Sequence, residues 1–357
     1  MQQVTDPVTR EVIKNALMSI ADTMALTVVR TARSAVIKHG MDFSTSLFNA
    51  EGQQVAQGLT LPPHLGSMAP ALEGVMNAFG DDVQPGDIFA NNDPYEGASH
   101  LPDIFLFKPI FKNEVLMAWS CCIGHQTDIG GRVAGGNACD STEIYQEGLR
   151  IPPVKLYEAG RPITALFDIL ERNVRVPRNA LGDLRAQLAA SHICEQACYR
   201  MATRYGLDRF KAGFSELLLY AERLTRSEIS AFPDGVYAFT DQLDDDGIDP
   251  DPIPITFTLT ISGDRLIADF EGTAPQVRGA INSALSFTKS AVYACLRCLM
   301  SPDVPTNSGC FRCLDVRVPE ATLANPVLPA PVAARGLTGF RLANTIMGAL
   351  AQMAPDR

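Results

Sequence analysis

The sequence lacks the features that bring a protein to nucleic acid, to a membrane or to a secretion pathway. Lys and Arg number 30 against 40 Asp and Glu, which gives a net charge of −10, and basic residues form no run. Nucleic acid and anionic membrane are therefore not expected partners. The N-terminus has no basic segment followed by an apolar one, as a secretory signal has. Unbroken apolar runs such as 104–107 and 217–220 fall far short of the roughly 18–20 residues that span a bilayer.

Motifs for nucleotide binding and for serine nucleophiles are also missing. No Gly-x-x-x-x-Gly-Lys-Ser/Thr or Gly-x-Ser-x-Gly stretch occurs, and the glycines of 130–136 do not form a dinucleotide fingerprint. Cys121 and Cys122 lie in an apolar run, which favours core packing over nucleophilic catalysis. The nine cysteines are an odd number spread over 357 residues and indicate buried thiols in a reducing compartment. We therefore expect a cytoplasmic protein that does not itself bind nucleotide.

Hydrophobic periodicity predicts an α+β (mixed α/β) fold in which antiparallel β-hairpins carry the site and pack with long helices. Three regions are expected: 1–160 with the candidate site, a helical region 161–232, and a mixed hairpin and helix region 233–357. The predicted helices are 8–38 behind a cap at Asp6, 64–79, three over 163–232 broken at Pro177 and near 206–208, 282–300 and 340–353. The predicted hairpins lie within 40–58, 104–123 and 255–270, and 130–153 is expected to be a long loop.

The central hairpin joins two of the five histidines. His100-Leu101-Pro102-Asp103 opens it and His125 closes it. A three-residue loop at 112–114 sets His125 opposite Leu101 and on the face of Asp103, whereas a two-residue loop at 113–114 brings His100 onto the face of His125. His100 and Asp103 can reach one ion only if Pro102 breaks the strand pattern between them.

Imidazole and carboxylate ligands at this place suit Zn²⁺, Mn²⁺ or Fe²⁺, and an incomplete protein ligand set leaves a position for water. The alternative is that hydrogen-bonded histidines simply stabilise the base of the hairpin. A competing zinc site is the pair of Cys-x-x-Cys motifs at 295–298 and 310–313. The first pair lies in an apolar helical pattern, so buried thiols are the preferred interpretation of Cys295, Cys298, Cys310 and Cys313.

Several segments together resemble the B subunit of the hydantoinase and oxoprolinase family, which is related to a subunit of acetone and acetophenone carboxylases. The resemblance covers essentially the whole chain and is carried by the segments 6–8, 41–44, 63–68, 92–95, 100–103, 125–131 and 147–153. It implies that Asp42, His100, Asp103 and His125 hold one divalent metal ion, Zn²⁺ or Mn²⁺. Asp42 could not have been found from periodicity. Many relatives carry a second His where this chain has Gln126, which leaves the subtype open.

The resemblance also implies an ATP-dependent hydrolysis of a cyclic amide such as a hydantoin, 5-oxoproline or a similar lactam. ATP is bound by a partner A subunit, which phosphorylates the carbonyl oxygen, and this chain completes hydrolysis with a metal-bound water, so a hetero-oligomer is expected. His125 and Asp128 are the candidate catalytic residues, with Asp128 as a general base or equally as a carboxylate that caps a turn. Glu147 and Arg150 are candidate substrate contacts, or else a solvated loop face.

Two other functions remain open from the sequence. One is a subunit of an ATP-dependent acetone or acetophenone carboxylase, and the other is a noncatalytic scaffold subunit with a structural metal. Relatives continue beyond the residue that matches Arg357, so the chain is expected to be truncated at its C-terminus relative to the family.

Overall fold

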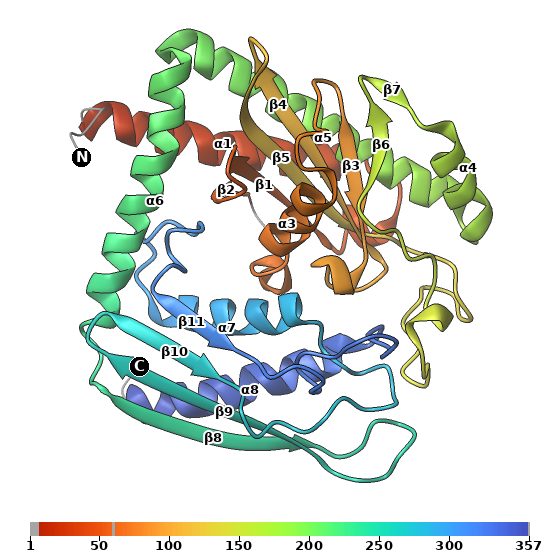
Figure 1. The fold of residues 1–357 in the computed structure, drawn as a ribbon, viewed down its shortest axis with the longest axis vertical. Helices are drawn as coiled ribbons and strands as arrows, with labels where there is room; N and C mark the ends of the chain where they lie inside the picture. The colour runs from red at the N-terminus through yellow and green to blue at the C-terminus, as the bar shows by residue number, and fades with distance from the viewer. Residues whose placement is uncertain (1–6, 59–60, 356–357) are drawn as a thin grey trace.

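Two β-sheets with helices packed on them form the part of the chain that the computed structural model describes, residues 7–58 and 61–355 (Figure 1). The strands of the first sheet are β1 (Phe43–Asn49), β2 (Gln54–Gln57), β3 (Ile88–Asn91), β4 (Asp103–Lys112), β5 (Val115–His125), β6 (Val154–Glu158) and β7 (Arg161–Pro162). They lie in the order β2-β1-β5-β4-β3-β6-β7, and every neighbouring pair is antiparallel.

The second sheet consists of β8 (Gly235–Leu243), β9 (Ile253–Ser262), β10 (Arg265–Asp269) and β11 (Leu314–Arg317), in the order β11-β10-β9-β8. The helices are α1 (Pro7–Thr31), α2 (Ala35–Lys38), α3 (Met68–Phe79), α4 (Thr164–Asn173), α5 (Pro177–Tyr205), α6 (Leu207–Ile229), α7 (Leu285–Leu299) and α8 (Arg335–Met353). Short 3-10 turns are η1 (Pro62–His64), η2 (Pro94–Glu96) and η3 (Ile144–Gln146). The predicted α+β class is confirmed.

The first sheet is buried on both faces, as its apolar strands predict. Helices α1 and α5 pack on each other and on β1 and β5, where one core cluster includes Leu17, Met24 and Phe43. Helix α3 belongs to a second cluster with Phe105 and Trp119. The two sides fix β1, β5 and β4 in place, and these three strands end at the candidate site.

Helix α1, over Val8–Thr31, is long and apolar enough to cross a membrane by length and composition alone, with a mean hydropathy of 1.4 in an 18-residue window. The expectation that the chain has no such segment rested only on unbroken apolar runs. It did not identify α1 as a candidate because polar residues interrupt the apolar residues of this helix. The core helix of a soluble protein meets the same criteria of length and composition. In this structure Leu17, Met24 and Val28 of α1 are fully buried in the core.

The predicted helix 8–38 is broken after Thr31. The backbone N–H groups of Arg33 and Ser34 both donate to Asp183 Oδ1, at 2.6 and 3.0 Å. Ser34 then caps the short α2 by accepting from the Ile37 N–H. A carboxylate 149 residues further along the chain therefore turns the backbone toward β1. The expected cap at Asp6 lies outside the described residues.

The second sheet packs on α8 and shares a core with α7, and α6 runs along one side of the molecule between the two sheets (Figure 1). The predicted helices of 163–232 are confirmed as α4, α5 and α6. Strands β8 and β11 were not predicted. Helix α8 begins at Arg335 rather than at residue 340, because Gly336 and Gly339 hide its first turn from the apolar pattern.

Candidate functional site

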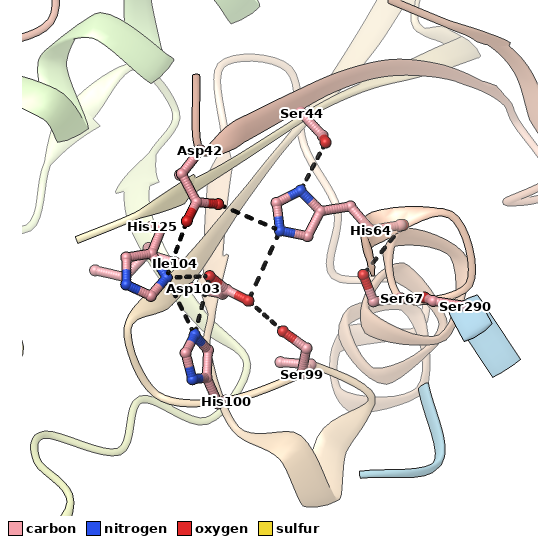
Figure 2. Close-up of polar contacts among 12 residues, drawn as sticks. Asp42, Ser44, His64, Ser67, Ser99, His100, Asp103, Ile104, His125 and Ser290 are labelled. Atoms are coloured by element: carbon pink, nitrogen blue, oxygen red, sulfur yellow. Dashed lines mark hydrogen bonds and ion pairs between the residues drawn. The ribbon is translucent and has the colours of Figure 1, made fainter. Parts of the chain in front are cut away.

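The ends of three neighbouring strands bring the predicted site together. Asp42 precedes β1, His125 ends β5, and Asp103 begins β4. The His125 N–H donates to the Asp42 carbonyl at 3.1 Å, and His125 pairs directly with Asp103 in the β4–β5 ladder. Because β5 lies between the other two strands, the three side chains meet at one edge of the sheet (Figure 2).

The observed register differs from both expected registers of the hairpin. The turn is the two-residue Asn113-Glu114, with both residues at positive φ, 51° and 63°. A bulge between Ile110 and Phe111 then shifts the pairing by one further residue and sets Asp103 opposite His125. His100 lies in the turn before β4. The N–H of Asp103, the first residue of β4, donates to the His100 carbonyl. Pro102 therefore stands outside the ladder, as the metal hypothesis required.

Three ligand atoms of this cluster lie at distances that suit one ion. His125 Nδ1 is 3.0 Å from Asp103 Oδ1, and His100 Nε2 is 3.2 Å from the same oxygen and 3.1 Å from His125 Nδ1. Ligands about 2.0–2.1 Å from one ion lie about 3.3 Å apart in a tetrahedral site and about 2.9 Å apart in an octahedral one. Among the described residues this set alone has three His, Cys, Asp or Glu ligand atoms so close together. The donor set and its spacing fit a divalent metal.

Asp42 and His64 flank this cluster at longer range. Asp42 Oδ2 is 3.8 Å from His125 Nδ1, and Asp42 Oδ1 is 3.9 Å from His64 Nε2. His64 Nε2 also lies 3.9 Å from Asp103 Oδ2, and its Nδ1 is 2.7 Å from the Ser44 hydroxyl (Figure 2). The Asp42 side chain is one-third exposed, whereas His64 is buried. The cluster therefore opens toward solvent beside Asp42.

The pKa shifts of His100, His64 and Asp103 favour the forms that a metal requires, neutral imidazole and charged carboxylate, whereas the shift of His125 favours the protonated imidazole. Burial, with the Arg335 charge, lowers the pKa of His100 to about 3, and burial lowers the pKa of His64. Burial opposes ionisation of Asp103, but the Arg335 charge and the hydrogen bonds to His100 and His125 outweigh it and hold the pKa of that carboxyl well below its usual range. For His125, hydrogen bonding to Asp103 overcomes burial and raises the pKa.

Asp128 holds the loop that follows β5. Its carboxylate accepts from the N–H groups of Gly130, Gly135 and Arg175, and it pairs with the Arg175 guanidinium at 2.9 Å. Burial opposes ionisation, but these bonds lower the pKa of Asp128. Of the two roles expected for Asp128, the contacts favour the carboxylate that caps a turn. A general base must be free to take a proton, and these oxygens are engaged.

We expect Asp128→Ala to lower the free energy of unfolding by about 2–4 kcal/mol, because four donors lose a charged acceptor. Urea denaturation measures this. The matched control is Asp140→Ala in the same loop, whose exposed pair with Arg132 contributes about 0.5 kcal/mol or less. Unchanged stability together with lost activity would return Asp128 to the role of general base.

Glu147 and Arg150, the expected substrate contacts, do not form an open rim. Glu147 is 2% exposed, and its Oε1 accepts from the N–H groups of Val332 and Ala333 at 2.7 and 2.9 Å. Arg150 pairs with Asp93, with Nε 3.1 Å from Oδ2. Glu147 therefore binds a distant segment of its own chain, which corrects its placement on a solvated or substrate-facing surface.

The four cysteines of the two Cys-x-x-Cys motifs do not gather into a metal cluster within the described ranges. Cys295, Cys310 and Cys313 are buried and Cys298 is exposed, and all are free thiols. Cys295 Sγ contacts the Ala343 carbonyl, and Cys313 Sγ contacts the Cys310 carbonyl. The structure favours packing thiols over a zinc ribbon.

Cys310→Ser is therefore expected to leave the metal content of the purified chain unchanged, because Cys310 belongs to the core of the second sheet and not to the group of His100, Asp103 and His125. Inductively coupled plasma mass spectrometry on wild type and variant side by side measures this. A loss of metal in the variant would establish the ribbon instead.

Sequence reasoning missed two buried residues of the site, His64 and Arg335. His64 lies in the segment 63–68, which is one of those that carry the family resemblance, so the resemblance could have identified it as a candidate site residue. Arg335 Nη2 lies 2.7 Å from Asp103 Oδ2 across 232 residues of chain, and no spacing or motif pointed to it.

Comparison with known proteins gives consistent matches over the whole chain. The family model described as hydantoinase B/oxoprolinase matches residues 6–357. The beta subunit of the caprolactamase of Pseudomonas jessenii is 38% identical over 354 residues, which cover 99% of this chain and 61% of that protein. The B subunit of a putative D-/L-hydantoinase from a Pseudomonas species is 34% identical over 99% of this chain and 62% of its own length. The chain thus spans about three fifths of the length of these relatives.

Solved structures agree with the sequence matches. The crystal structure of the ATP-dependent caprolactamase from Pseudomonas jessenii has a TM-score of 0.94 at 38% identity, over 99% of this chain and 61% of that one. A nucleotide-free acetone carboxylase structure has a TM-score of 0.91 at 19% identity, over 98% of this chain and 48% of that one, and shows likeness of fold. The chain belongs to the hydantoinase B/oxoprolinase family.

Proposed function

We propose that this chain is the B subunit of an ATP-dependent amidohydrolase and completes the hydrolysis of a cyclic amide with one Zn²⁺ or Mn²⁺ ion. The substrate class is a hydantoin, 5-oxoproline or a similar lactam. Two relatives support this proposal by their names, the beta subunit of a caprolactamase and the B subunit of a putative hydantoinase. The observation that carries it is the triangle of His100, Asp103 and His125 ligand atoms at 3.0–3.2 Å.

The ligand set has the character of a catalytic rather than a closed structural site. Two imidazoles and one carboxylate leave coordination positions unfilled, and Asp42 borders the side that reaches solvent. A divalent ion bound there would act as a Lewis acid, which lowers the pKa of water and stabilises negative charge on oxygen. His100, Asp103 and His125 would hold it, with Asp42 as a fourth ligand or a contact to water.

The protein side chains around the cluster define the remaining chemistry. Burial lowers the pKa of His64, its Nδ1 lies 2.7 Å from the Ser44 hydroxyl, and its Nε2 faces Asp42 and Asp103. This fixed orientation places one nitrogen where it can donate or accept a proton near the open side. Because burial disfavours its protonated form, His64 is suited to accept a proton only transiently.

Activation of the amide is assigned to a partner. A lactam carbonyl is a poor electrophile, and phosphorylation of its oxygen makes the carbon reactive. The sequence has no phosphate-binding loop of the Walker type. We therefore propose an A-type ATP-binding subunit as partner, in a hetero-oligomer that gathers phosphorylation and hydrolysis in one assembly.

Reconstitution tests this proposal. The full chain, loaded with Zn²⁺ or Mn²⁺, is combined with a hydantoinase A-type subunit, ATP and a panel of lactams and hydantoins, and the ring-opened product is measured by mass spectrometry. Hydrolysis that requires ATP, both subunits and the ion is the expected result. Incorporation of labelled bicarbonate would instead indicate a carboxylase, and full activity after metal removal would overturn the catalytic role of the ion.

A further inference from the structure

A segment of the second half of the chain, residues 332–335, contacts the candidate metal site at two points. The Ala333 carbonyl lies 3.2 Å from His100 Nδ1, and Arg335 Nη2 lies 2.7 Å from Asp103 Oδ2. The same segment is itself held by Glu147, which accepts from Val332 and Ala333. Residues that are far apart in sequence thus set the orientation of two of the three ligands.

The contact with His100 fixes which ring nitrogen is free. When Nδ1–H donates to the Ala333 carbonyl, Nε2 carries the lone pair and faces Asp103 and His125. Metal-binding histidines usually make such a second hydrogen bond to a carbonyl or carboxylate, which fixes the tautomer and the ring orientation. The segment therefore prepares His100 as an Nε2 ligand.

The two oxygens of Asp103 have separate partners. Oδ1 is in contact with His125 Nδ1 and His100 Nε2. Oδ2 accepts from the Ser99 hydroxyl and from Arg335 Nη2, which also lies 3.2 Å from Ser99 Oγ. Because each oxygen has different close partners, Oδ1 alone faces the His100 and His125 imidazoles, whereas the nearest imidazole contact of Oδ2 is His64 Nε2 at 3.9 Å.

Arg335 is itself fixed in place. The residue is 7% exposed, and its guanidinium lies over the ring of Phe287, 4.4 Å from the ring centroid. Phe287 belongs to α7, which packs on α8. A single nitrogen of the fixed guanidinium, Nη2, donates to both Asp103 and Ser99.

We propose that Arg335 is a positioning residue that restricts Asp103 to a single coordinating oxygen. The inference rests on the proposed metal-dependent function and deepens it. Without Arg335, the Asp103 carboxylate is free to turn and bind an ion through both oxygens, which fills a position that must stay open for catalysis. The second half of the chain thereby determines the coordination number at a site built on strands of the first half.

Cobalt binding to the full chain tests the proposal, because visible absorption of Co²⁺ weakens as its coordination number rises. Wild type is compared with Arg335→Met and Arg335→Lys. The matched control is Arg341→Met, on the same helix, whose guanidinium pairs with Asp241 at 3.0 Å instead. For Arg335→Met we expect the visible bands of bound Co²⁺ to weaken, because both oxygens of Asp103 become available to the ion. Arg335→Lys keeps a donor nitrogen and should recover part of the band intensity, and Arg341→Met should match wild type.

The outcomes separate this inference from the proposal on which it rests. Wild type that binds no Co²⁺ overturns the metal site and the role of Arg335 with it. Wild type that binds Co²⁺ while folded Arg335→Met keeps the same spectrum overturns the role of Arg335 alone. If Arg335→Met does not fold, Arg335→Ala decides, and a wild-type spectrum in that variant overturns the inference.

Discussion

Replacing His100 with alanine is expected to weaken divalent metal binding by more than about 100-fold, since loss of a direct ligand should exceed the cost of losing an outer contact. His100 Nε2 is one corner of the ligand triangle, and methyl cannot take its place. Burial keeps the imidazole neutral, because the pKa of His100 is lowered to about 3, so alanine changes no charge in the apo protein. The fold should therefore survive, while the proposed ATP-dependent hydrolysis is lost.

Metal content after dialysis, measured by mass spectrometry, and thermal unfolding of the apo protein test the two parts of this prediction. His192→Ala is the matched control, because His192 is exposed on α5 and pairs with Glu195 at 3.5 Å. The control should retain wild-type metal content. Full metal occupancy in His100→Ala would show that the metal does not bind at this hairpin. Unfolding of the apo form of this variant would indicate that His100 has a structural role.

The core of this site was predictable from the sequence because both motifs belong to one hairpin. Pairing of two adjacent apolar strands necessarily brings 100–103 close to His125, whatever the register. The register itself was not predictable, since the bulge between Ile110 and Phe111 leaves no mark in the apolar pattern. Alternation of buried residues cannot locate a bulge in a strand that is buried on both faces.

The rest of the site depends on contacts between distant parts of the chain. Asp42 lies beside His125 because β1 pairs with β5, and the family resemblance supplied it before the structure did. His64 reaches the site from a 3-10 turn. Arg335 reaches it from the first turn of α8, which contains glycine and which hydrophobic periodicity did not predict. Local patterns carry no information about such packing, so these residues required the structure.

Glu147→Gln is expected to make the protein more stable than wild type at alkaline pH. Burial raises the pKa of Glu147 to about 8 from 4.5, so the folded protein keeps this carboxyl neutral where the unfolded chain ionises it. Its contribution is fully present below about pH 4.5 and is lost as pH rises through about 8, with a slope of about 1.4 kcal/mol per pH unit between. Glutamine removes this titration and can still accept from Val332 and Ala333 through Oε1.

Urea unfolding at pH 5, 7 and 9 measures the effect. The two proteins should agree within about 1 kcal/mol at pH 5, and the variant should gain on the order of 2–4 kcal/mol at pH 9. The matched control is Glu171→Gln on α4, where Glu171 is exposed. This substitution removes the same charge and should not change the pH dependence of the free energy of unfolding. Parallel curves for wild type and Glu147→Gln would mean that Glu147 is already ionised in the fold. In that case the positive charge of Arg335 would stabilise the Glu147 carboxylate by more than burial destabilises it.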